Sequence, residues 1–205
     1  QMPPLVSHRV DDDAVQLFRD WIAGLKPELP FVQDWRVEDL APDLAGLPER
    51  SSRSNAIEAG RAAFRATGCF QCHRIEGEGG TVGPDLAGVA RRLQPRALLE
   101  SVLEPSRVIA DEYAAFQFER RDGTIAEGRV EREDEEVVVV RPPSAFSNEL
   151  LTLAKRDIVE RRRSPTSNMP VGVVNVLRKD QVLDLLAYLL SDPQPQPQPR
   201  KASPR

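Results

Sequence analysis

The chain contains two cysteines, Cys69 and Cys72, which are separated by two residues and followed directly by His73. A disulfide framework needs cysteines spread along the chain, so this pair does not indicate one. A zinc site usually takes four Cys or His ligands, and the only other histidine is His8, in a terminus without regular apolar spacing. A thioredoxin-like redox pair sits in a βαβ unit, whereas helical spacing precedes Cys69. Two interpretations of the pattern remain: a motif for covalent attachment of a group, and a chance coincidence of scarce residues.

Cys-X-X-Cys-His is the attachment signature of haem c. The chemistry requires this spacing, because the two thiols add to two vinyl groups on adjacent edges of the porphyrin. Two intervening residues let one helical turn present both sulfurs, and the next residue then faces the iron. The motif predicts one covalently bound haem c, held by Cys69 and Cys72, with His73 as an axial iron ligand.

The second axial position of such an iron can be taken by Met, His or Lys, or it can stay open. The chain has two methionines, Met2 and Met169. A lone methionine is often core filler. Met169, however, follows the polar residues Ser167 and Asn168 and precedes Pro170, a setting typical of a loop. We therefore expect Met169 to be the second iron ligand.

The loop around Pro84 is expected to cover the His73 side of the haem. A ligating histidine usually donates its other ring N–H to a fixed acceptor. Because proline holds the backbone rigid, the Pro84 carbonyl is a candidate for that acceptor. Gly83-Pro84 is also a common turn signal, and the two interpretations are compatible.

Helical and strand periodicities divide the chain. Apolar residues recur at helical spacing at 13–25, around 35–47, from 55 to the cysteine motif, at 95–103 and at 180–190. From Tyr113 the period changes to alternation, and Asp122-Gly123 is a hairpin signal. These patterns predict a mainly α fold with a small antiparallel β-meander at about 114–154. The charged cluster at 131–136 is predicted to be a solvated turn, and the Pro/Gln tail to be disordered.

These residues resemble, in type and order, the class I c-type cytochromes. The resemblance is carried by Gly60, Phe64, Cys69, Cys72, His73, Pro84, Leu86, Met169, Pro170 and the segment 185–189. It implies that the helix carrying Gly60 crosses the helix carrying Tyr188, with glycine allowing close approach. It also implies that the Pro84 carbonyl accepts a hydrogen bond from His73 and that Leu86 contacts the haem.

More narrowly, residues 55–190 resemble the haem-binding domain of the planctomycete or Verrucomicrobium type. The matching stretches are 77–86, 103–106, and Tyr113 with the strands after it. Such domains often lie beside a dehydrogenase domain, which implies a dehydrogenase as redox partner. The predicted organisation is an N-terminal helical extension and linker (1–54), a class I cytochrome c core (55–191) with the β insertion at about 113–158, and a disordered tail (192–205).

The N-terminal segment shows a possible internal repeat. Met2 precedes Trp21 by 19 residues, and Met169 precedes Tyr188 by the same number. The segment is either the end of an upstream cytochrome-like domain or a coincidence of spacing. If the repeat is real, Met2 has lost its haem and is not an iron ligand in this chain.

These features predict an electron carrier rather than an enzyme, because His/Met ligation leaves no open position for a substrate. The carrier could also be a domain or subunit of a larger oxidoreductase. The alternatives are a five-coordinate ligand-binding or sensor haem, and a structural module whose meander docks a partner.

Charge and hydropathy limit the partners and the location. The net charge of −4 and pI of about 5.4 offer no basic face for nucleic acid. No apolar run approaches the roughly 18 residues of a transmembrane segment. We expect a monomer. Because haem c is attached outside the cytoplasm, we also expect a periplasmic location, with the signal peptide absent from this chain.

Overall fold

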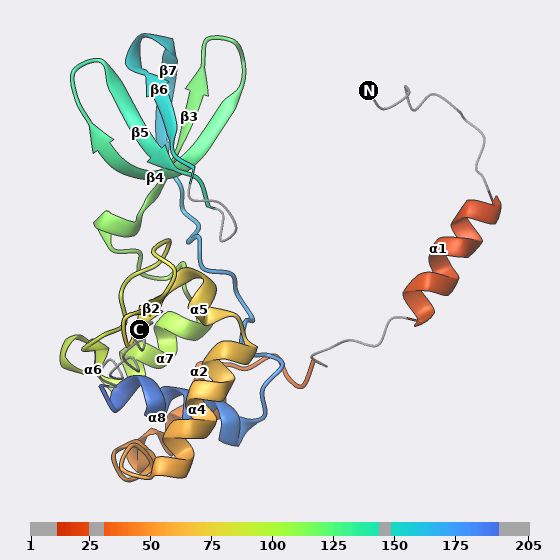
Figure 1. The fold of residues 1–205 in the computed structure, drawn as a ribbon, viewed down its shortest axis with the longest axis vertical. Coiled ribbons are helices and arrows are strands. Elements are labelled where there is room, and N and C mark those ends of the chain that lie inside the picture. Colours follow the sequence, from red (N-terminus) through yellow and green to blue (C-terminus); the bar gives the residue numbers. More distant parts are fainter. Residues whose placement is uncertain (1–11, 25–30, 144–148, 193–205) are drawn as a thin grey trace, which may run out of the picture. The chain divides into compact units, whose positions relative to one another are not determined.

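The computed structural model describes residues 12–24, 31–143 and 149–192. By compactness the chain divides into residues 1–30 and residues 31–205. The described part of the first unit is helix α1 (Asp12–Gly24), and all other described elements belong to the second unit (Figure 1). Met2, His8 and the Pro/Gln tail lie outside the described residues.

Helix α1 is amphipathic, as its apolar spacing predicts. Its large apolar side chains, Leu17, Phe18, Trp21 and Ile22, are 59–70% exposed. Asp12 and Asp13 lie in the first turn, where carboxylates interact favourably with the helix dipole.

Helices of the second unit form one apolar core. The helices that contribute side chains to it are α2 (Val37–Leu40), η1 (Ala41–Gly46), α3 (Leu47–Arg50), α4 (Ser54–Ala66), α5 (Cys69–Cys72), α6 (Val89–Arg92), α7 (Pro95–Leu103) and α8 (Lys179–Leu190). Two short helices, η2 (Asp111–Tyr113) and η3 (Lys155–Asp157), do not contribute to it. Val37, Leu40 and Leu47 are buried in this core, so the segment 31–54, which the sequence assigned to an extension, packs on the helices. The domain limits at 54 and 191 remain predictions.

Helix α8 is the centre of the helical core. Its buried side chains include Val182, Leu185, Leu186, Tyr188 and Leu189, which cover more than one face of the helix. Each such side chain contributes about 1.5–3 kcal/mol when fully buried. A helix that is apolar almost all round must be enclosed by neighbours, and α8 has its most extensive contacts with α4.

Helices α4 and α8 cross at Gly60. A Cβ atom at this position would lie 2.1 Å from the Asp184 carbonyl oxygen and 2.6 Å from Tyr188 Cβ. The rings of Phe64 and Tyr188 pack edge to face beside the crossing, with their centroids 6.0 Å apart. Any side chain at position 60 would therefore push the two helix backbones apart.

Among the described residues, five antiparallel strands form the large sheet: β3 (Ala115–Arg120), β4 (Ile125–Glu133), β5 (Val137–Arg141), β6 (Leu151–Ala154) and β7 (Ile158–Arg163). Their order is β6-β5-β4-β3-β7. The sheet is therefore larger than the meander at about 114–154 that the sequence predicted. The predicted meander lacked β7, whose Glu160–Arg163 segment has no apolar alternation. This strand is held by backbone pairing with β3 and by ion pairs such as Arg161–Glu133.

The large sheet has its own small core, built from Phe118, Ala126, Val138, Val140 and Leu153. The prediction that the cluster 131–136 is only a solvated turn was wrong in part, because residues 131–133 belong to strand β4. At the other end of the sheet, the Ser164 N–H donates to the Ala115 carbonyl at 2.9 Å. The insertion therefore begins and ends at neighbouring points.

Replacing Gly60 with alanine tests the helix crossing. Because the added Cβ atom would overlap backbone atoms, the overpacking cost lies at the upper end of the usual range, about 2–3 kcal/mol, against a gain of roughly 1 kcal/mol in helix propensity. We expect Gly60→Ala to lower the free energy of unfolding by roughly 1–2 kcal/mol, measured by urea titration followed by circular dichroism. Gly46→Ala is the control, because a Cβ there would meet nothing within 4 Å. Equal stability of the two variants would contradict the crossing.

Candidate functional site

The cysteine motif occupies one helical turn directly after α4. Gly68 adopts a left-handed conformation (φ 75°) that ends α4 and begins α5, and the His73 N–H donates to the Cys69 carbonyl at 2.9 Å. Neither thiol of Cys69 and Cys72 is in a disulfide. Burial raises the pKa of the Cys69 thiol, which the hydrogen bond with Thr67 partly opposes, and burial also raises the pKa of the Cys72 thiol. Both sulfurs are therefore neutral thiols at neutral pH.

The ring of His73 is fixed by the loop that follows the motif. Its Nδ1 lies 2.9 Å from the Pro84 carbonyl oxygen. Because a carbonyl can only accept, the proton sits on Nδ1 and leaves the Nε2 lone pair free. Burial lowers the pKa of His73, and the hydrogen bond with Pro84 partly opposes this effect. The imidazole is therefore neutral, which is the form that binds a metal ion.

The backbone of the loop lies against the imidazole. The Gly83 N–H donates to the Cys72 carbonyl at 2.8 Å, and the Leu86 N–H donates to the Arg74 carbonyl at 2.8 Å. A Cβ atom on Gly83 would lie 2.7 Å from Cε1 of the His73 ring. The ring therefore has backbone packed against one side and a hydrogen-bond acceptor at Nδ1.

A cavity of about 560 Å³ adjoins this ring. Of the residues that the sequence indicated, Cys69, His73, Pro84, Leu86 and Met169 line it, whereas Cys72 does not. The walls are mostly apolar and come from the helices, with side chains including Phe64, Leu98, Val102, Leu185 and Leu189. From the sequence these apolar residues were predicted only to lie on helices, because helical periodicity does not distinguish a core face from a cavity wall.

Met169 reaches the cavity from the loop between the large sheet and α8. Its N–H donates to the Ser167 hydroxyl at 3.1 Å, and the Ser167 N–H donates to the Ser106 hydroxyl at 3.0 Å. The loop is thereby attached to the segment after α7. In sequence, Met169 lies far from His73, and the fold brings both to the same cavity.

These residues fit a haem. A flat, largely apolar macrocycle needs an apolar cavity with few polar groups at defined places. A free Nε2 of a neutral histidine and a thioether are ligands that haem iron accepts. Within residues 12–24, 31–143 and 149–192, no group of three or more His, Cys, Asp or Glu side chains is arranged to hold a metal ion.

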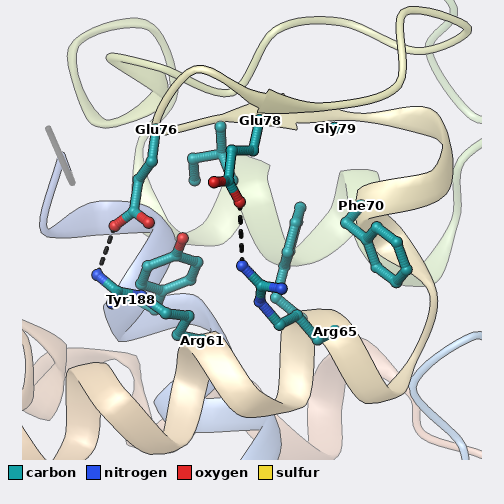
Figure 2. A pocket seen from close by; sticks show the side chains of 9 residues that line it. Arg61, Arg65, Phe70, Glu76, Glu78, Gly79 and Tyr188 are labelled. Atoms are coloured by element: carbon teal, nitrogen blue, oxygen red, sulfur yellow. Dashed lines mark hydrogen bonds and ion pairs between the residues drawn. The ribbon is translucent and has the colours of Figure 1, made fainter. Parts of the chain in front are cut away.

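Ion pairs connect α4 to the β hairpin after His73, formed by β1 (Arg74–Ile75) and β2 (Glu78–Gly79). Figure 2 shows Arg61 and Arg65, on successive turns of α4, reaching toward Glu76 and Glu78. The N–O distances are 2.6 Å for Arg61–Glu76 and 3.2 Å for Arg65–Glu78. This connection was not predicted from the sequence, although the i, i+4 spacing of the arginines was a signal.

Tyr188 lies beside these ion pairs and lines a cavity of about 240 Å³ (Figure 2). Burial and the charge of Glu76 raise the pKa of its hydroxyl, and the nearby guanidinium of Arg61 opposes them. The side chain of Tyr188 therefore joins the apolar α4–α8 contact to the charged surface of the hairpin.

The comparison with protein families agrees with this site. Residues 57–137 match the family model described as cytochrome c. The match supports a c-type cytochrome, and the cytochrome c domain implies a covalently bound haem c. The family's members are generally electron carriers rather than enzymes, and they typically lie outside the cytoplasm. The matched region contains Cys69–His73 and Pro84 but ends before Met169.

The comparison with curated proteins adds nothing to this assignment. No curated protein matches the chain. In the part of the chain that the structure describes, no helix is long and apolar enough to cross a membrane.

Gly83→Ala tests the packing of the loop against His73. Because the added methyl group would overlap the imidazole, we expect the ring to tilt and its hydrogen bond with Pro84 to weaken. In the haem-loaded protein, the Soret and visible bands should shift relative to the wild type, as recorded by absorption spectroscopy. Gly46→Ala should leave the spectrum unchanged. A wild-type spectrum for Gly83→Ala would show that the loop yields without moving the ring.

Proposed function

We propose that the protein carries single electrons through a haem c attached at Cys69 and Cys72, with His73 and Met169 as axial iron ligands. The observation that supports this proposal is the cavity lined by Cys69, His73 and Met169, which come from segments about 100 residues apart. A histidine on one side and a methionine on the other raise the iron potential and leave no open position for a substrate.

Each residue has a definite task in this proposal. When bound, the haem supplies the one-electron Fe(III)/Fe(II) couple. His73 presents Nε2 because its Nδ1–H is held by the Pro84 carbonyl. Leu86, Leu185 and Leu189 keep water from the cavity, which favours the iron state of lower charge. Met169 is held in its loop by the Ser167 and Ser106 hydroxyls.

The finer assignments also belong to the proposal. We propose that the domain is of the planctomycete or Verrucomicrobium type, that it acts as a monomer in the periplasm, and that a dehydrogenase supplies its electrons. The resemblance supports the domain type and the dehydrogenase, and the attachment of haem c outside the cytoplasm supports the location. A carrier of this kind needs only a weak, small interface with its partner, because the complex must dissociate after each transfer.

Intact mass spectrometry of the denatured protein tests the attachment. Thioether bonds survive denaturation, so the wild type should retain the mass of one haem. Cys69→Ala/Cys72→Ala should lose it. Cys72→Ala alone should keep a single thioether, with a visible spectrum shifted by the one remaining vinyl group. A haem mass retained by the double variant would contradict attachment at these cysteines.

Met169→Ala tests the second axial ligand. The oxidised protein should lose the weak methionine–iron charge-transfer band, and its reduction potential should fall because a soft ligand that favours Fe(II) is gone. Met2→Ala is the matched control, since Met2 is the other methionine of the chain. An unchanged band in Met169→Ala would exclude this ligand. Rapid carbon monoxide binding by the reduced wild type would favour the five-coordinate sensor instead.

A further inference from the structure

The guanidinium of Arg129, on strand β4, joins the large sheet to the loop beside His73. Its Nη2 donates to the Thr81 carbonyl at 3.4 Å and its Nη1 donates to the Val82 carbonyl at 3.5 Å. These distances are at the long end of the hydrogen-bond range. The side chain is only 15% exposed. The guanidinium of this largely covered arginine therefore faces the two backbone carbonyls.

Glu131 and Tyr113 hold Arg129 in place. Glu131 accepts hydrogen bonds from Arg129 Nη2 at 2.5 Å and from Arg141 Nε at 2.7 Å. Burial raises the pKa of Glu131, but the bonds from both arginines outweigh it, so the pKa lies below its ordinary value. The Arg129 guanidinium also lies over the ring of Tyr113, 5.1 Å from its centroid. These contacts therefore fix the position of the guanidinium independently of its contacts with the loop.

The contacted carbonyls immediately precede the residues that orient His73. Val82 is followed by Gly83, whose N–H is bonded to the Cys72 carbonyl, and then by Pro84, whose carbonyl faces Nδ1 of His73. A displacement of Thr81 and Val82 would therefore move the acceptor of the imidazole and the backbone that packs against it.

We propose that Arg129 is a positioning residue for His73, acting through the Thr81 and Val82 carbonyls and the Pro84 carbonyl after them. The inference rests on the proposed function, in which His73 is an iron ligand. The inserted sheet thereby has a function at the haem site, because Arg129 lies on its strand β4. Tyr113, whose ring lies under the Arg129 guanidinium, also lines the cavity. The sheet controls the orientation of the imidazole without touching it.

The test uses the haem-loaded protein in wild-type form and as Arg129→Gln, Arg129→Lys and Arg132→Gln. Arg132 is the matched control, because it lies exposed on the same strand. The first measurement is hydrogen exchange of the Gly83 amide. We expect exchange to be about tenfold faster in Arg129→Gln, because this variant loses the charged donor that bonds to the loop carbonyls.

The second measurement is the proton NMR spectrum of the oxidised protein, in which the haem methyl signals report the orientation of the axial imidazole. We expect these signals to move in Arg129→Gln, to return part of the way in Arg129→Lys, and to stay in place in Arg132→Gln. Rescue by lysine also guards against a folding defect in Arg129→Gln.

The possible outcomes separate the two proposals. Unchanged Gly83 exchange in Arg129→Gln would overturn the contact with the loop. Faster exchange with unmoved haem methyl signals would overturn the positioning role, because Arg129 would then only stabilise the loop. The proposed function is checked in the wild type before any variant is compared: absence of histidine ligand signals there would overturn it, and the positioning role with it.

Discussion

The close crossing of α4 and α8 at Gly60 determines where the functional residues lie. The attachment motif begins three residues after α4 ends, and Met169 lies ten residues before α8 begins. Because α4 and α8 are in backbone contact at Gly60, both flanking segments reach the cavity lined by Phe64, Leu185 and Leu189. A wider crossing would separate the segments that carry His73 and Met169. The site therefore depends on a glycine at position 60, because only a residue without a Cβ atom permits this close crossing.

Charged side chains hold the segment 73–84, which the apolar core alone does not fix. The segment 73–84 contains short strands and glycines but little apolar surface of its own, so the hydrophobic effect cannot hold it alone. Arg61 and Arg65 attach its hairpin to α4, and Arg129 approaches the Thr81 and Val82 carbonyls from the large sheet. Partly exposed ion pairs contribute up to about 1 kcal/mol each. Their value here is geometric, because they fix the loop that aims the His73 ring.

The sequence predicted the features that depend on local pattern. Helical periodicity located α7 and α8 to within one residue, because long amphipathic segments carry a strong signal. The scarcity of cysteine and histidine made the Cys69–His73 motif readable. The sequence did not predict β7, since a strand of successive arginines is formed by tertiary pairing rather than by its own pattern. It also missed Arg129, because its contacts with residues 81 and 82 link positions far apart in the chain.

The folded insertion also limits the entropic cost of bringing Met169 to the cavity. Residues 104–178 separate α7 from α8, and the span 115–164 makes up about two thirds of them. If this span were unstructured, tripling the length of the connection would cost roughly 1 kcal/mol in loop closure. The Ser164–Ala115 hydrogen bond closes the span on itself, so the remaining connection behaves like a short loop. Arg163, which bonds to Asp111 and to the Ile109 carbonyl, then attaches the end of the sheet to a segment of the cavity wall. The insertion can therefore be large without loosening the loop that carries Met169.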